Sequence, residues 1–247
     1  MILLLALAAA SPADTGARWR AEAGYALEVH TRDRAAWQTA RTAVGYRWAR
    51  ATLTADVQTA SRFGRWEQAG GLETYFSAGR RWSGYARLQV APGAEVLPRT
   101  DASGQLTAAV ARGWEATAGY RRMGFSDETV DIVSAGAARY AGVWYLQALG
   151  SAVPGHGTTG FGVALLARRY ADPDRPDRFI EFRGSAGREV VLLGPATAPD
   201  LRATGAAGVR FVSPLTRDWG LSVGATWTAE DRVPSRTGVA VSFYRTW

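Results

Sequence analysis

The chain has 247 residues, a formal net charge of +7 and no cysteine, which excludes both a disulfide framework and a thiolate metal site. All 29 of its lysine and arginine residues are arginines, and they are scattered without a basic block, which argues against a nucleic acid partner. The arginine bias either serves the recognition of phosphate or carboxylate groups or reflects coding bias in an arginine- and alanine-rich genome.

The first residues predict export. The apolar run from Ile2 to Ala10 is too short to span a bilayer as a helix. It ends on the small residues Ala8-Ala9-Ala10, as a signal-peptidase site does, although no basic residues precede the run. We therefore expect residues 1–10 to be a signal peptide, with residue 13 as the alternative end, and residues 17–247 to be a single domain.

Alternation of apolar and polar residues, which is typical of β-strands, dominates the rest of the chain. It is clearest from Trp219 to Thr228, where apolar residues alternate with glycine, serine and threonine. We predict an all-β fold of fourteen strands, with twelve as the alternative, over residues 18–29, 36–50, 51–61, 68–81, 85–90, 105–112, 114–123, 129–140, 143–149, 161–170, 178–189, 201–212, 219–228 and 237–247.

The links between these segments fall into two classes that alternate along the chain. Short turns are predicted near residues 50, 82, 113, 141, 174 and 215, and generally longer loops, such as 62–67 and 229–235, lie between them. No proline after the signal peptide falls inside a predicted strand. Outer-membrane barrels have this asymmetry, with short periplasmic turns and longer external loops.

Barrel width decides which face of each strand looks inward. About fourteen strands make a barrel too wide for its own side chains to fill, so an apolar interior would be empty. The polar face must line a wet lumen and the apolar face must contact lipid, which predicts an antiparallel up-and-down transmembrane barrel. The charged residues predicted to face the lumen are Arg41, Arg47, Asp56, Glu73, Arg87, Glu115, Arg121, Asp131, Arg168, Glu181, Arg183, Arg202 and Arg210.

Tryptophan placement agrees with a membrane barrel, because none of the ten tryptophans falls at the middle of a predicted strand. With both chain ends on the periplasmic side, Trp37, Trp66 and Trp227 fall near the outer ends of strands or in outer loops. The residues predicted to form an aromatic girdle at the periplasmic interface are Trp19, Trp48, Trp82, Trp114, Trp144, Trp219 and Trp247.

The last strand has the alternation that the barrel assembly machinery reads. Val239, Val241 and Phe243 are apolar at every second position and the chain stops on Trp247. Arg245 interrupts the series, and we consider Tyr244 as a partial substitute for the missing aromatic residue. We expect this strand to contact the assembly machinery and the outward face of the barrel to contact outer-membrane lipids.

The stretch from Gly119 to Ile132, with Tyr140 and Gly142-Val143-Trp144 after it, resembles the YaiO family of outer-membrane β-barrel proteins. Arg168-Arg169-Tyr170 and Phe179-Ile180-Glu181-Phe182 resemble the same family, so that the resemblance covers about residues 114–190. It implies an outer-membrane location and a link to envelope polysaccharide, but no reaction. The motif residues that carry it are Gly119, Tyr120, Arg121, Phe125, Ser126, Asp127, Val130 and Asp131.

The charged lumen has two interpretations. It is either a basic constriction that selects anions or acidic sugars, or a network of arginine–carboxylate pairs that braces the wall and closes the channel. We predict a passive channel or port for envelope saccharides or polysaccharides, with a non-conducting structural or assembly barrel as the alternative.

Enzymatic activity finds little support in the sequence. A lipid hydrolase would need a histidine beside a serine on the outer surface of adjacent strands. His30 and His156 both lie near loops, and neither has a serine two residues on. We keep lipid hydrolysis as a third, weaker hypothesis and expect no cofactor and no metal site.

Overall fold

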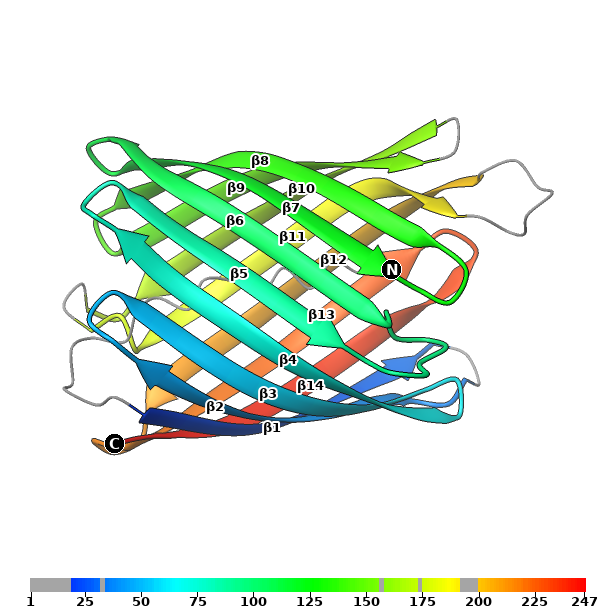
Figure 1. Ribbon diagram of the computed structural model, residues 1–247, viewed down its shortest axis with the longest axis horizontal. Helices are drawn as coiled ribbons and strands as arrows, with labels where there is room; N and C mark the ends of the chain where they lie inside the picture. The colour runs from blue at the N-terminus through cyan, green and yellow to red at the C-terminus, as the bar shows by residue number, and fades with distance from the viewer. Residues whose placement is uncertain (1–18, 32–33, 156–157, 173–174, 192–199) are drawn as a thin grey trace.

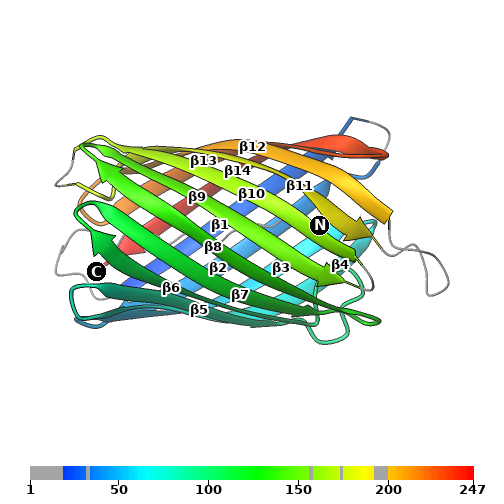
Figure 2. The same cartoon turned by 90° about the horizontal axis from the view of Figure 1, so that it is seen from above.

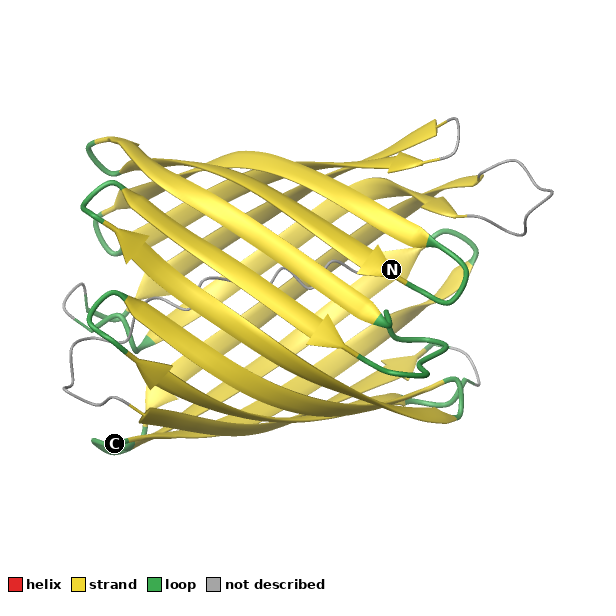
Figure 3. Ribbon diagram, viewed as in Figure 1, coloured by secondary structure: helices red, strands yellow, loops and turns green. Residues whose placement is uncertain are grey.

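The computed structural model describes residues 19–31, 34–155, 158–172, 175–191 and 200–247. The predicted signal peptide lies outside the described residues, as does His156. The described part of the chain consists of strands and loops (Figure 3). It contains no helix that is long and apolar enough to cross a membrane. The strands are β1 (Trp19–His30), β2 (Trp37–Arg47), β3 (Ala51–Arg62), β4 (Arg65–Ala78), β5 (Trp82–Val90), β6 (Thr100–Ala111), β7 (Trp114–Gly124), β8 (Thr129–Ala141), β9 (Trp144–Gly155), β10 (Thr158–Tyr170), β11 (Phe179–Val191), β12 (Asp200–Pro214), β13 (Trp219–Glu230) and β14 (Val233–Thr246).

The strands form a closed antiparallel barrel, which confirms the predicted fold (Figures 1 and 2). Each strand pairs with its neighbours in sequence, and β1 also pairs with β14. At this seam the Trp19 N–H donates to the Trp247 carbonyl at 3.0 Å, and the Trp247 N–H donates to the Trp19 carbonyl at 3.1 Å. Closure gives every strand a partner on both sides, as a membrane requires.

The two ends of the barrel differ in the parts of the chain that they contain. We call the end where β1 begins and β14 ends the terminal rim, and the opposite end the loop rim. In Figure 1 the terminal rim is on the left, where the C-terminus is marked. The strands cross the wall at a steep tilt, as barrel closure demands.

The alternation read from the sequence corresponds to an apolar outside and a polar inside. On β10, Phe161, Val163 and Leu165 are 64%, 55% and 57% exposed on the outer face, whereas Leu166 and Arg168 are buried on the inner face. Exposed apolar side chains of this kind recur around the wall. In water such a large apolar surface would promote aggregation, so these side chains indicate a lipid-facing surface.

Two of the predicted long loops are wrong. The links predicted over 62–67 and 229–235 contain only two residues between strands, Phe63–Gly64 and Asp231–Arg232. Phe63 and Gly64 have φ values of 53° and 77°, the left-handed geometry that tight hairpin turns require. Backbone pairing therefore continues beyond the last apolar alternation, and the length difference between the two rims is smaller than predicted.

The prediction that no proline interrupts a strand is also wrong. Pro154 lies in β9 and Pro234 in β14, both near the loop rim, and Pro214 is the last residue of β12. Near Pro234 the pairing of β13 with β14 shifts register between Thr228 and Glu230. Prolines are tolerated at such strand ends and bulges because few ladder hydrogen bonds are lost there.

Candidate functional site in the lumen

The inner face of the barrel surrounds a cavity of about 1420 Å³. Its lining extends from Tyr75 and Tyr140 near the terminal rim to His30 and Arg62 near the loop rim. Because the lining residues come from both ends of the barrel, the cavity runs along the axis rather than indenting one surface.

A first ion-pair network joins β2, β3, β4 and β5 across the inner wall. Arg87 reaches Asp56 at 3.2 Å and Glu73 at 2.9 Å, and Arg41 Nε lies 3.3 Å from the same Asp56 carboxylate. Gly71 makes room for this contact, since a Cβ there would lie 2.8 Å from Asp56 Oδ1. Asp56 is fully shielded and is shared between two guanidinium groups, so this part of the wall is braced by charge.

A second network lies on β10 and β11. Arg168 donates from Nε and Nη2 to Glu181 Oε2 at 2.9 and 2.6 Å, and Arg183 donates from Nε to Glu181 Oε1 at 2.6 Å. The guanidinium of Arg168 also lies 4.4 Å from the centre of the Phe179 ring. On β12, Arg210 donates from Nε to Ser222 at 2.9 Å. The carboxylate of Glu181 is thus held between two arginines.

The other predicted lumen residues occupy separate positions on the inner wall. Arg121 donates from Nε to Asp101 at 2.8 Å. Arg47 and Glu115 line the cavity, and Arg202 lies on the same face of β12 as Arg210. Twelve of the thirteen predicted residues therefore lie on the inner face, where nine of them belong to the two networks, to the Arg121–Asp101 pair or, for Arg210, to a bond with Ser222.

Asp131 is the exception, and its predicted place in the lumen is wrong. It lies on the outer face of β8, where the Tyr120 hydroxyl donates to it at 2.5 Å and Arg122 lies 3.8 Å away. Its neighbour Ile132 points inward and is buried. These residues sit near the loop rim, where polar groups on the outer face can find hydrogen-bond partners outside the hydrocarbon layer, so polarity no longer reports the face.

The predicted periplasmic girdle lies along the terminal rim on the outer face. Its members Trp19, Trp48, Trp82, Trp114, Trp144, Trp219 and Trp247 are between 36% and 53% exposed. Three of them have an outward arginine over the ring: Arg139 lies 5.1 Å from the Trp114 ring, and Arg245 lies 5.5 Å from the Trp219 ring and 5.8 Å from the Trp247 ring. This is the arrangement of indole and cation found at a membrane–water interface.

Tyr244 does not extend the outward aromatic series of the last strand. Its side chain is buried on the inner face, where Arg20 lies 4.0 Å from the centre of its ring. The considered substitution of Tyr244 for the aromatic residue missing at Arg245 is therefore wrong. Adjacent residues of one strand point to opposite faces, so Tyr244 cannot occupy the outward row.

Trp37 is an inward residue that the sequence reasoning missed. It lines the cavity near the loop rim rather than facing lipid. The signal was present, because Trp37 has the same strand parity as Arg41 and Arg47, both assigned to the lumen.

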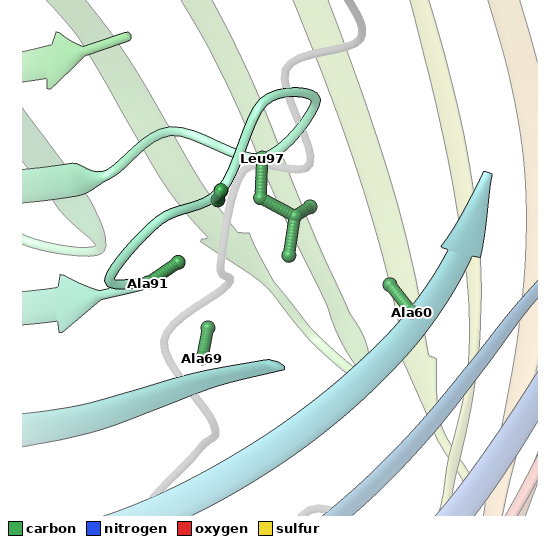
Figure 4. Packing of buried hydrophobic residues seen from close by; sticks show 5 residues of the cluster. Ala60, Ala69, Ala91 and Leu97 are labelled. Carbon is green, nitrogen blue, oxygen red and sulfur yellow. The ribbon is translucent and has the colours of Figure 1, made fainter. Parts of the chain in front are cut away.

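The sequence reasoning also missed a loop that folds into the mouth of the barrel. Loop 91–99, between β5 and β6, places Leu97 against Ala60 and Ala69 of the inner wall (Figure 4). Glu67 fixes the loop, because its carboxylate accepts backbone N–H groups of residues 95, 96 and 97 at 2.7, 2.9 and 2.7 Å. The loop narrows the mouth of the barrel on that side. Its anchor, Glu67, lies in a segment that the sequence predicted to be a link between strands.

Among the described residues, no group of three or more histidine or acidic side chains is arranged to hold a metal ion. His30 lies on the inner face at the loop rim, next to Trp37.

Comparison with known families decides the identity of the chain. A family model described as "YaiO membrane beta barrel domain" matches residues 19–190. The chain belongs to the YaiO family. The match includes the first network and the second network as far as Arg183, and it confirms the family suggested by the run from Gly119 to Ile132. No curated protein matches the sequence of this YaiO protein at a significant level.

Solved structures share the fold of this YaiO protein. A structure titled "CymD monoaromatic hydrocarbon channel" is 8% identical with a TM-score of 0.59, covering 94% of this chain and 90% of its own. The Acinetobacter baumannii outer membrane protein Omp33 is 10% identical with a TM-score of 0.54, covering 94% and 100%. A "Bacterial polysaccharide outer membrane secretin" is 10% identical with a TM-score of 0.52, covering 93% and 98%. The YaiO protein is thus a barrel of the Gram-negative outer membrane, with the fold of porins and channels.

Proposed function

We propose that this YaiO protein is a passive channel or port that carries polar solutes, saccharides among them, across the outer membrane. The cavity carries the proposal, because its charged lining reaches both rims and its volume of about 1420 Å³ exceeds the roughly 300–1,000 Å³ of typical small-molecule pockets. A lumen of this kind suits solutes that need hydrogen-bond donors along their path.

Saccharides are favoured as solutes by the chemistry of the wall. The guanidinium groups of Arg41, Arg121 and Arg183 are partly exposed on the inner wall and can present N–H donors to hydroxyl or carboxylate oxygens. A polysaccharide secretin adopts the same fold, which makes this solute class a reasonable first choice for assays.

The second candidate is a non-conducting structural or assembly barrel. It is favoured by the shielding of Asp56 and Glu181, whose arginine partners tie neighbouring strands together. In that case the charged residues stabilise the wall and carry no solute.

Planar-bilayer recording separates the two candidates. Purified folded protein should give stepwise conductance, and Arg87→Gln or Arg121→Gln should change the step size because both side chains lie on the inner wall. Folding is checked by the shift in electrophoretic mobility on heating. A silent bilayer with fully folded protein supports the structural barrel and contradicts the channel.

Other assignments complete the proposal. Residues 1–10 direct export as a signal peptide, the terminal rim faces the periplasm, and the outward residues Val239, Val241 and Phe243 of β14 are read by the barrel assembly machinery. We propose no enzymatic role, so phospholipid and lipid A should remain intact in its presence. Lipid hydrolysis lost on His156→Ala would contradict this.

A further inference from the structure

Five inward-facing residues gather at the loop rim on the adjacent strands β14, β1, β2 and β3. Cross-strand pairing places Glu28 opposite Trp37 and His30 opposite Arg236. Arg62 follows one position beyond the pair Gln38–Ser61 and so comes beside Trp37. All five line the cavity. We call this group the Trp37 cluster: Glu28, His30, Trp37, Arg62 and Arg236.

The indole of Trp37 holds two guanidinium groups. Arg236 lies 4.5 Å and Arg62 5.0 Å from the centre of its ring, and the imidazole of His30 packs edge-on at 5.0 Å. A guanidinium that stacks by its face keeps its N–H groups directed outward from its edge. The cluster therefore orients two arginine forks while shielding their faces from water.

Charge within the cluster is not balanced. Arg236 is only 7% exposed, and its Nε lies 3.4 Å from Glu28. Arg62 forms no ion pair with any carboxylate of the described residues. Arg34, exposed on the same cavity wall, adds a further positive charge. Two further acidic residues lie on this side: Glu67, whose carboxylate is occupied by the backbone of loop 91–99, and Glu230 on the lining.

Hydrogen bonding is incomplete at the same place. The Nε atoms of Arg62 and Arg236 and the Nδ1 atom of His30 are buried and have no hydrogen-bond partner in the described part of the protein. A buried donor without an acceptor costs about 1–3 kcal/mol, more when it is charged. Two guanidinium Nε donors of this kind lie on one indole, and Arg236 Nε has only the long 3.4 Å contact with Glu28, which indicates that an acceptor with negative charge belongs there.

We propose that the Trp37 cluster binds an oxyanion, and that the sugar carboxylate of an acidic saccharide is its ligand at the loop-rim entrance of the lumen. The assignment of an acidic saccharide as the ligand rests on the proposed function, in which saccharides pass through this lumen. A carboxylate would accept from the N–H edge of Arg62 and from Arg236, the geometry that the arginine fork recognises. Glu28 then holds Arg236 in place without neutralising Arg62.

Isothermal calorimetry on the folded full chain in detergent tests the site with glucuronate, inorganic phosphate and glucose as probes. We expect saturable binding of glucuronate and none of glucose. Arg62→Gln and Arg236→Gln should each weaken glucuronate binding about tenfold or more, as the loss of a charged hydrogen bond does. Arg62→Lys, which keeps the charge but loses the fork, should weaken it less and guards against misfolding. Arg122→Gln, on the outer face of the same rim, should leave it unchanged.

The outcomes separate the site from the channel. Calorimetry detects binding whether or not the barrel conducts, so a silent bilayer with intact glucuronate binding contradicts the channel and leaves the site standing. Absence of saturable glucuronate binding, or equal binding by the wild type and a folded Arg62→Gln variant, overturns the site. Binding of phosphate without glucuronate overturns the assignment to acidic saccharides.

Discussion

Arg168 and Glu181 face each other on neighbouring strands of the inner wall, with Nη2 of the arginine 2.6 Å from Oε2 of the carboxylate. Glu181 has no exposed surface, and Arg183 occupies its other oxygen. A single carboxylate thus pairs with two guanidinium groups and is itself shielded from the lumen. The pair is the most enclosed charge contact on the described wall, and its removal has a predictable cost.

Glu181→Ala should lower the free energy of unfolding by about 3–5 kcal/mol, because Arg168 is left as a buried charge without its partner. Urea unfolding in lipid vesicles, followed by tryptophan fluorescence, measures this change. Asp131→Ala is the control, since its contacts with Arg122 and with the Tyr120 hydroxyl lie on the exposed outer face and should contribute clearly less. A loss for Glu181→Ala no larger than that of the control would contradict the interpretation.

Gly136→Ala should also destabilise the barrel, by about 1–3 kcal/mol. A Cβ at residue 136 would lie 2.2 Å from the Ala148 carbonyl oxygen and 2.9 Å from the Leu149 Cα, so that the backbone of β9 must move. Gly150→Ala, one pair along on the same two strands, is the matched control because its Cβ would meet the Ala135 carbonyl at an ordinary 3.8 Å. The two variants are compared by unfolding in urea, and equal midpoints would rule out the steric explanation.

The proposed channel should prefer anions. Arg62 and Arg210 face the cavity, and neither has a carboxylate within ion-pair distance in the described part of the chain. The reversal potential in a potassium chloride gradient should therefore show anion selectivity, and Arg210→Glu should shift it toward cations. Arg122→Glu on the outer face should produce no shift. An unchanged reversal potential for Arg210→Glu would mean that this part of the wall does not meet the ions.

Glu67→Ala should release loop 91–99 from the wall, because three backbone N–H groups lose their acceptor. We expect faster proteolytic cleavage within the loop and a larger single-channel conductance. Glu95→Ala is the control, since Glu95 pairs with the exposed Arg65 at the edge of the loop. Similar cleavage rates for the two variants would show that Glu67 is not the anchor.

Two tryptophans should respond oppositely to quenchers. With the other tryptophans replaced by phenylalanine, Trp114 should be quenched by brominated lipid, because it lies exposed on the outer face at the terminal rim. Trp37 should resist brominated lipid and respond to aqueous iodide, because it faces the cavity. Strong lipid quenching of Trp37 would place it outside the barrel and would also remove the proposed oxyanion site.

The number of strands, the closure of the barrel and the face that looks inward follow from the sequence, because apolar and polar residues alternate along most of the wall. Arg87, Arg168 and Glu181 lie at polar positions of alternating segments, and lipid leaves no other place for them. The same rule holds for Trp114 and Trp144, which begin strands at the interface. Periodicity of two, combined with barrel width, was sufficient for these residues.

Alternation was misleading where lipid no longer constrains the outer face. Asp131 points outward because Tyr120 and Arg122 partner it there, and Ile132 points inward. The Trp37 cluster and the anchor at Glu67 depend on contacts between residues far apart in sequence. Arg62 and Arg236, for example, both lie over the indole of Trp37. No local pattern encodes such contacts, so these sites required the structure.

The seam between β1 and β14 has a consequence for biogenesis. Arg20 pairs with Thr246, so the contact that removes the last free edge joins residues separated by almost the whole chain. Forming it closes the longest loop in the protein, which makes it the contact of highest entropic cost and slow to form. Until β14 arrives, β1 and β13 expose backbone donors and acceptors that hydrocarbon cannot satisfy. Insertion into hydrocarbon and closure of the barrel by β14 are therefore coupled.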